Sequence, residues 1–148
     1  MRWPARVKPG VSGALVSQID LLASFAALLG ASASARGATA DREARARDSE
    51  NVLPALLGKA KAARAVLVEQ GGGVALALRQ GDWKYIAPGQ GPRVQVNTNT
   101  ETGNDPGPQL YDLARDPGER TNLAAIHPDK VRELADLLEA IRRRSNPR

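Results

Sequence analysis

Residues 78–86 read Leu78-Arg79-Gln80-Gly81-Asp82-Trp83-Lys84-Tyr85-Ile86 and carry the clearest structural pattern of the sequence. Two short apolar runs flank Gln80-Gly81-Asp82, a pattern typical of two strands joined by a tight turn. Side chains alternate along a strand, so Trp83 and Tyr85 share one face and Lys84 and Ile86 share the other. Because so short a turn joins antiparallel neighbours, we expect a hairpin with strands at residues 74–79 and 83–86.

Further strands are predicted on either side of this hairpin. Residues 65–70 are apolar and β-branched and lead into Gly71-Gly72-Gly73, a second turn signal. Residues 87–108 are rich in Gly, Pro, Asn and Thr and indicate a long excursion. Residues 109–112 then predict a last short strand. Together these segments predict a small, mostly antiparallel sheet of about four strands.

The final element is a helix predicted at residues 128–143. Pro128 suits its first position, and the arginines at 142–144 complement the negative end of the helix dipole. We expect its apolar stripe to pack across the sheet, which makes the fold class α+β. The stripe consists of Val131, Leu134, Leu137, Leu138 and Ile141.

A hydrophobic helix is predicted before the sheet, at residues 17–29. Ser17 can cap it with its hydroxyl, Asp20 stands at the capping-box position, and Gly30 suits a left-handed end. Apolar side chains occupy most of its circumference. We therefore expect other protein to cover this helix.

Residues 31–47, which follow this helix, are small, polar and basic and predict a loop. A short helix is then predicted at 50–57, with Asp48 and Ser49 as possible caps and Gly58 as its end.

The composition indicates a thin core. A chain of 148 residues fits one domain or a substantial piece of a larger one. Aromatic residues make up only 3% of it, although large rings normally supply much of the buried area of a core. The formal charge of +5 permits binding to nucleic acid, but no aromatic platform or recognition motif accompanies the charge.

Several classes of site are excluded or disfavoured by what the sequence lacks. It has no cysteine, which excludes disulfides, cysteine-ligated zinc and a cysteine nucleophile and leaves the redox compartment undetermined. No apolar run approaches the ~20 residues that span a bilayer, so no membrane partner is expected. Residues 1–6 have no apolar region behind them and do not predict a secretory signal, so localisation stays unassigned.

Five segments, in this order along the chain, resemble the C-terminal portion of sulfatases, members of the alkaline-phosphatase-like superfamily. Directly after the second of these segments, Ala23-Ser24 stands where the family has Pro-Thr. The last two segments are the most specific. The five segments, each with the family sequence pattern that it resembles, are residues 1–10 (pattern RWPG), 16–22 (iDl), 48–58 (llPlL.G), 78–86 (lR.GdwKyi) and 109–124 (LYDL..DP.E..Nla).

The resemblance implies a catalytic centre that lies upstream of all five segments. Sulfatases use formylglycine, made from a cysteine or serine in a (C/S)-x-(P/A)-x-R motif, together with calcium or a similar divalent cation. Ser32-Ala33-Ser34-Ala35-Arg36 has serine and arginine at this spacing, but Ser34 stands where the motif needs proline or alanine. We therefore expect no catalytic, cofactor-binding or metal-binding residues and no bound cofactor in this chain.

Three polar positions have a functional and a structural interpretation, and the structural one is favoured for each. His127 precedes Pro128 and suits a solvent-facing cap. Lys84 could face a substrate anion in a full enzyme, although a strand lysine with its stem on apolar surface and its head in water is the simpler interpretation. Asn104-Asp105 precedes a proline and suits a turn.

The resemblance implies that residues 1–62 end a catalytic domain and that residues 63–148 form the C-terminal subdomain of a sulfuric ester hydrolase. This fragment would support the fold and the substrate cleft and would be inactive alone. Its expected partner is the missing N-terminal catalytic domain, or a second copy through exposed apolar surface. Two alternatives remain: a free-standing binding module and, less favoured, a small basic nucleic-acid-binding protein.

Overall fold

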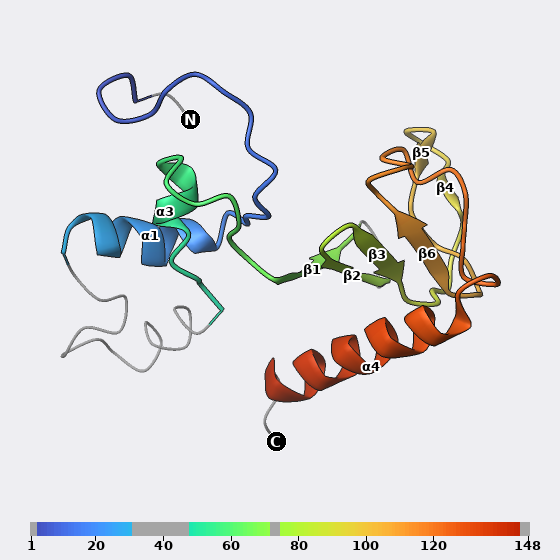
Figure 1. Ribbon diagram of the computed structural model, residues 1–148. Coiled ribbons are helices and arrows are strands. Elements are labelled where there is room, and N and C mark those ends of the chain that lie inside the picture. Colours follow the sequence, from blue (N-terminus) through green and yellow to red (C-terminus); the bar gives the residue numbers. More distant parts are fainter. Residues whose placement is uncertain (1–2, 31–47, 72–74, 146–148) are drawn as a thin grey trace. The chain divides into compact units, whose positions relative to one another are not determined.

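The computed structural model describes residues 3–30, 48–71 and 75–145 (Figure 1). The expected loop at 31–47 and the near-match at 32–36 therefore lie outside the described residues. The chain divides into two compact units, Met1–Ala65 and Val66–Arg148. The assignment of these parts to a catalytic domain and a C-terminal subdomain stays a prediction.

The second unit contains the predicted sheet. Its strands are β1 (Val66–Gln70), β2 (Leu76–Gln80), β3 (Trp83–Ile86) and β6 (Gln109–Asp112). They lie in the order β1-β2-β3-β6, and every neighbouring pair is antiparallel. The second strand begins later and ends later than the predicted 74–79. The α+β fold class is confirmed.

Helix α4 (Pro128–Ser145) packs on one face of this sheet, as the apolar stripe predicts (Figure 1). The register places Leu78 beside Tyr85 and Tyr85 beside Leu110, so one row of side chains crosses three strands. Leu134 and Leu138 of α4 are buried against this row. Because all these residues belong to the second unit, that unit has a hydrophobic core of its own.

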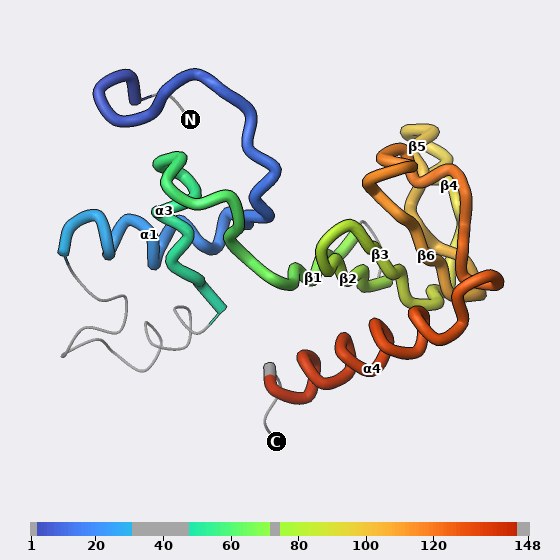
Figure 2. Tube along the Cα trace, viewed as in Figure 1, coloured from blue at the N-terminus to red at the C-terminus, as the bar shows by residue number. Residues whose placement is uncertain are grey.

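The excursion at 87–108 holds a small hairpin that the sequence did not predict. Its strands are β4 (Val94–Gln95) and β5 (Thr100–Glu101), drawn in yellow in Figure 2. Strands of two residues carry no alternating pattern that could be detected in the sequence. A second apolar cluster lies on the sheet and includes Ala77, Ile86 and Tyr111, whose positions alternate with those of the main core row.

The first unit contains helices α1 (Asp20–Leu28) and α3 (Leu53–Leu56), and both are shorter than predicted. The helix predicted from Ser17 begins at Asp20, because the Asp20 carboxylate accepts the Ser17 amide and holds that residue in a turn before the helix. Gly30 ends α1 at a φ of +71°, as expected. Ser49 does not cap α3; its hydroxyl bonds to α1 instead.

Helix α1 turns its small and polar side chains inward. Asp20, Ala23 and Ser24 are buried, whereas Phe25 is about half exposed and Leu29 is 82% exposed. The expected surplus of apolar surface is therefore present on this helix. None of the helices in the described ranges is long and apolar enough to cross a bilayer.

Candidate functional site

The strongest polar cluster of the second unit surrounds Lys84 on β3. Its Nζ lies 2.8 Å from Oε1 of Glu119 and 3.4 Å from Oε2 of Glu69. Burial disfavours the charge, but the two carboxylates outweigh that effect and raise the pKa of Lys84. The lysine was predicted to extend its head into water; instead its side chain is only 17% exposed and is held by two acids.

The turn that carries Glu119 is built around Asp116. The Asp116 carboxylate accepts the amides of Arg120 and Thr121 at 2.7 and 2.8 Å. Glu119 has a φ of +53°, a left-handed conformation that is uncommon for a residue other than glycine. These two hydrogen bonds to Asp116 hold the backbone on the C-terminal side of Glu119, and the turn places the Glu119 carboxylate beside Lys84.

Asn122 attaches the same loop to the outer edge of β6. Its Oδ1 accepts the amides of Leu110 and Ala124, and its Nδ2 donates to the carbonyl of Pro108. The Leu110 carbonyl also accepts the amide of Leu123. This edge of the sheet is thus covered, and the polar atoms of Asn122 are engaged in holding the fold.

A second polar cluster lies in the first unit, where Asp20 pairs with Arg64. Arg64 Nη2 lies 2.6 Å from Asp20 Oδ1, and Arg64 Nε donates to Asp20 Oδ2 at 2.7 Å. The carboxylate also accepts the amides of Ser17 and Glu50. Burial alone would raise the pKa of Asp20, but the hydrogen bonds from Arg64, Glu50 and Ser17 outweigh it and lower the pKa.

Two serines extend this network between α1 and the segment before α3. The Ser49 hydroxyl accepts the amide of Ala23 and donates to the carbonyl of Ile19. The buried Ser24 hydroxyl accepts the amide of Val52. Arg64 also donates to the backbone carbonyl of Asp48. Arg64 had no sequence signal, since it lies 44 positions from Asp20 and belongs to no recognisable pattern.

His127 and the Asn104-Asp105 pair are not brought to either cluster. His127 is exposed, and its carbonyl accepts the amide of Val131 at the start of α4. Its ring packs edge-to-face with the Trp83 ring, with 5.5 Å between the ring centroids. Asp105 Oδ1 accepts the amide of Gly107, as expected for a turn residue. Asn104 is buried, and its Nδ2 donates to the carbonyl of Pro92.

These arrangements do not fit a divalent cation. Among the described residues, no three His, Cys, Asp or Glu side chains lie together in a way that could hold a metal ion. Asp20 is buried and turned toward a guanidinium, while Glu69 and Glu119 share the ammonium of Lys84. The described carboxylates at both clusters therefore serve ion pairs, and no reaction step through a metal can be built on them.

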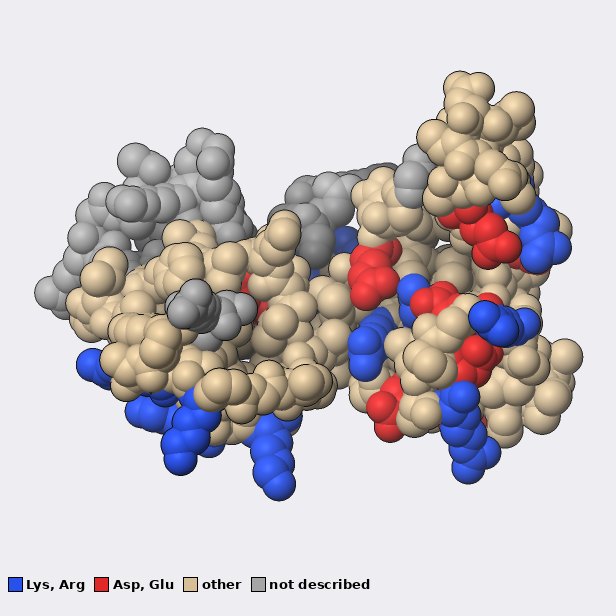
Figure 3. All heavy atoms as spheres, turned by 90° about the horizontal axis from the view of Figure 1, so that it is seen from above, with Lys and Arg blue, Asp and Glu red and all other residues tan. Residues whose placement is uncertain are grey.

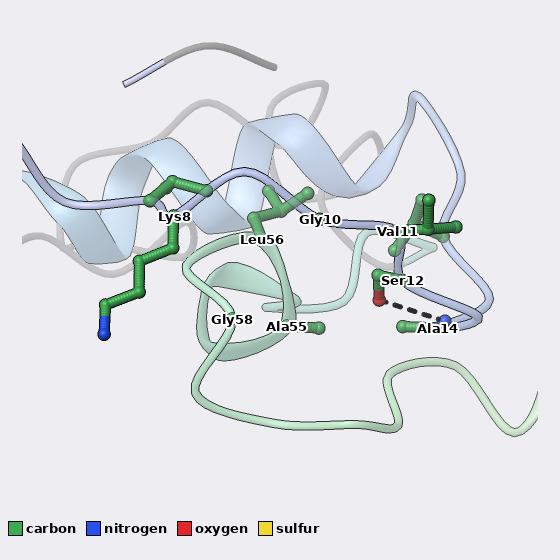
Figure 4. Close-up of a pocket in the computed structure, with 10 residues that line it drawn as sticks. Lys8, Gly10, Val11, Ser12, Ala14, Ala55, Leu56 and Gly58 are labelled. Atoms are coloured by element: carbon green, nitrogen blue, oxygen red, sulfur yellow. Dashed lines mark hydrogen bonds between the residues drawn. The ribbon is translucent and has the colours of Figure 1, made fainter. Parts of the chain in front are cut away.

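A shallow hollow of about 310 Å³ lies in the first unit (Figure 4). Lys8 is the charged residue on its wall, and Ser12 supplies a hydroxyl that accepts the amide of Ala14. No acidic residue or histidine is among the described residues that line it. The remaining wall is small or aliphatic: Val7, Gly10, Val11, Ala14, Val16, Ala55, Leu56 and Gly58.

Comparison with characterised proteins identifies the family. Over 144 residues, which make up 97% of this chain, the sequence is 46% identical to an N-acetylgalactosamine-6-O-sulfatase of Bacteroides thetaiotaomicron. The chain belongs to the sulfatase family. It corresponds to the C-terminal portion of these enzymes and spans 27% of the length of this relative.

Other sulfatases support the same assignment. Bovine arylsulfatase A is 33% identical over 155 aligned positions, which cover 95% of this chain and 28% of the relative. A solved structure from work on glycosaminoglycan metabolism by B. thetaiotaomicron superposes with a TM-score of 0.82 at 46% identity, covering 95% of this chain and 28% of that one. No family model matches.

A more distant structure agrees in fold alone. A 2-O glycosaminoglycan sulfatase superposes with a TM-score of 0.53 at 24% identity; the match covers 85% of this sulfatase chain and 24% of the other protein's chain.

The structure gives physical roles to two of the sulfatase-like segments of the sequence. The segment at 78–86 supplies Lys84, and the segment at 109–124 supplies Glu119 and Asn122, which join the loop to the sheet.

Proposed function

We propose that this chain forms the C-terminal part of a sulfuric ester hydrolase that acts on a sulfated sugar. In that enzyme it completes the fold and helps to wall the substrate cleft. The formylglycine nucleophile and the divalent cation that the family implies would come from the rest of the enzyme. Alone, the chain is expected not to hydrolyse sulfate esters.

The observation that carries this proposal is the 46% identity to an N-acetylgalactosamine-6-O-sulfatase along 97% of the chain. A match of this extent favours a common substrate class, a sulfate ester on an amino sugar. The chain spans only 27% of that relative, which supports a contributing rather than a complete catalytic role.

The engagement of the polar side chains also supports a scaffolding role. Lys84, Asp20 and Arg64 lie in ion pairs, and Asn122 bonds to three backbone groups. A catalytic acid, base or nucleophile must be able to reach a substrate atom. In the described structure these groups hold segments of the same chain together instead.

The exposed apolar side of α1 supports docking to the missing N-terminal catalytic domain. Leu22, Phe25 and Leu28 are each at least 40% exposed on this helix. Burial of such apolar surface contributes about 25 cal/mol for each Å², so covering this face would stabilise the complex with a packed partner substantially. The proposal therefore assigns this face to the interface with the rest of the enzyme.

A chimera tests the proposal. The corresponding C-terminal segment of the B. thetaiotaomicron N-acetylgalactosamine-6-O-sulfatase is replaced by this chain, and turnover of a small aryl sulfate and of N-acetylgalactosamine 6-sulfate is measured. We expect a folded chimera that retains turnover. The relative without this segment, and this chain alone, serve as controls and should be inactive.

Two results would contradict the proposal. The first is turnover by the pure chain alone that disappears when one of its own residues is substituted. The second is a folded but inactive chimera together with capture of a specific partner by the isolated chain, which would favour a free-standing binding module.

A further inference from the structure

The first unit carries four exposed cations that have no ion-pair partner among the described residues. Arg64 attracts the three described acids of the unit instead: it forms ion pairs with Asp20 and Glu50 and has a favourable charge interaction with Asp48. Figure 3 shows Lys and Arg side chains along one edge of this unit with no acidic side chain between them. The four cations are Arg6, Lys8, Lys59 and Lys61.

One of these cations, Lys8, lines the hollow of about 310 Å³. Lys59 does not line the hollow itself but follows Gly58, a lining residue just after α3. Figure 4 shows the ammonium of Lys8 clear of the other side chains drawn. Among the described residues, the lining of the hollow thus combines one lysine with an aliphatic wall and contains no carboxylate that would repel an anion.

Arg6, two positions before Lys8 in the sequence, lies in the turn at the start of the described chain. The amides of Arg6 and Val7 both donate to the carbonyl of Trp3, and the Arg6 guanidinium lies 5.4 Å from the centre of the Trp3 ring. Stacking on an aromatic ring restricts a guanidinium while leaving its donors in plane, where they can bind a sulfate in a bidentate manner.

We propose that Arg6, Lys8, Lys59 and Lys61 form a binding surface for a sulfated polysaccharide. The surface would hold an extended anionic chain through its sulfates, in addition to the one sugar that enters the catalytic cleft. The choice of a sulfated glycan rests on the proposed function. Spaced cations without interleaved acids attract polyanions, and the attraction weakens with salt.

The same surface is poorly suited to single-stranded nucleic acid. Binding of bases relies on aromatic side chains on which they can stack. Trp3 is engaged with Arg6, and no aromatic residue lines the hollow. Sulfate groups need only cationic donors, which this surface supplies.

The test measures binding of the complete 148-residue chain to chondroitin 6-sulfate at low salt, with desulfated chondroitin and DNA for comparison. The test variant is Lys8→Gln with Lys59→Gln. The matched control is Arg143→Gln with Arg144→Gln, which removes from α4 two exposed cations that form no ion pair with any other described residue. We expect about tenfold weaker binding for the test variant, as two exposed ion pairs would give, and less than about a twofold change for the control.

Three outcomes would overturn this inference: equal weakening by both variants, equal binding of desulfated chondroitin, or tighter binding of DNA. Circular dichroism checks that each variant keeps its fold. The chimera assay on a small aryl sulfate does not involve this surface. An active chimera without polymer binding therefore rejects the surface alone, and an inactive chimera with selective binding rejects the proposed function alone.

Discussion

Nζ of Lys84 lies 2.8 Å from Oε1 of Glu119, and this ion pair joins the centre of the sheet to the turn that precedes α4. Lys84 also sits beside Tyr111 of β6 in the register of the sheet. The pair therefore connects two sulfatase-like segments that lie 35 positions apart. Its partial burial and the left-handed backbone of Glu119 make it a sensitive point of the second unit.

Glu119→Gln should destabilise the second unit by about 1–3 kcal/mol, because the hydrogen-bonded ammonium of Lys84 loses its nearest carboxylate. Urea unfolding followed by circular dichroism measures the change. The control is Glu139→Gln, which removes an exposed ion pair with Arg142 on α4 and should cost less than about 1 kcal/mol. Equal costs for both substitutions would show that the buried pair has no special importance.

Asp20→Asn should loosen the first unit by about 3 kcal/mol at neutral pH, because it leaves Arg64 without its charged partner. Hydrogen exchange of the α1 amides, corrected for intrinsic rates, measures the loss. Glu50→Gln provides the control: it removes a mostly solvated partner of the same arginine and should have a small effect. Unchanged protection in Asp20→Asn would contradict the structural role of the pair.

The same carboxylate should make the first unit sensitive to acid. The folded pKa of Asp20 is lowered, so its contribution is present above the unfolded value of about 3.9 and is lost as the pH falls through the folded pKa. Exchange of the α1 amides should therefore accelerate below about pH 4 beyond the intrinsic rate. Asp20→Asn should remove this part of the pH dependence. An identical acid profile in both proteins would refute the linkage.

Leu134→Ala should cost about 2–5 kcal/mol, because Leu134 is completely buried between α4 and the core row of the sheet. Thermal unfolding followed at the helical circular dichroism band measures the loss. Ile126→Ala is the matched control, since Ile126 is 68% exposed before the same helix and should change stability by less than about 1 kcal/mol. A small effect of Leu134→Ala would mean that α4 does not pack on the sheet as described.

Gly89→Ala should destabilise the excursion by about 1–3 kcal/mol through overpacking. A Cβ at this position would lie 2.8 Å from Oδ1 of Asn104 and 3.0 Å from Cβ of Ala75. Gly107→Ala is the control in the same excursion, because its added Cβ would meet only Asp105 at an ordinary 3.5 Å. Differential scanning calorimetry compares the two, and equal melting temperatures would contradict the close packing around Asn104.

The isolated chain should bind a hydrophobic dye and self-associate through the exposed side of α1. Leu22→Lys combined with Phe25→Lys should reduce dye fluorescence and light scattering without lowering the stability of the second unit. Ile126→Lys removes an exposed apolar residue of the second unit and should change neither signal by much. A stable monomer that does not increase the fluorescence of the dye would contradict this prediction.

Local patterns predicted the regular elements of the second unit well. The turn at 80–82 and the alternation around it gave the bounds of β2 and β3 to within one residue, except at the start of β2, which lies two residues later than predicted. The agreement is close because tight turns and strand alternation depend on neighbouring residues. The stripe on α4 predicted its packing for the same reason. The β4–β5 hairpin was missed, since its strands are too short to show a period.

The polar clusters could not be predicted in the same way. Ser49 was interpreted as a cap of α3, yet its hydroxyl bonds to α1 at Ala23, 26 positions away. Lys84 was interpreted as a solvated lysine, yet it lies between two carboxylates contributed by β1 and the 116–119 turn. The sequence suggested a local partner for Ser49 and water for Lys84, but the fold brings a partner from a distant part of the chain to each.

The sequence by itself determined the sulfatase family, the α+β class and the position of the main sheet strands and the final helix. The family follows from the resemblance of five segments to sulfatase motifs, whereas the fold class and the elements follow from periodicity, which acts over one turn or one strand. Tertiary structure alone decided that Asp20 meets Arg64, that Glu119 meets Lys84, and that α1 leaves its largest apolar side chains exposed. Such pairings depend on which distant segments the packed chain brings together, and local sequence patterns do not predict these contacts.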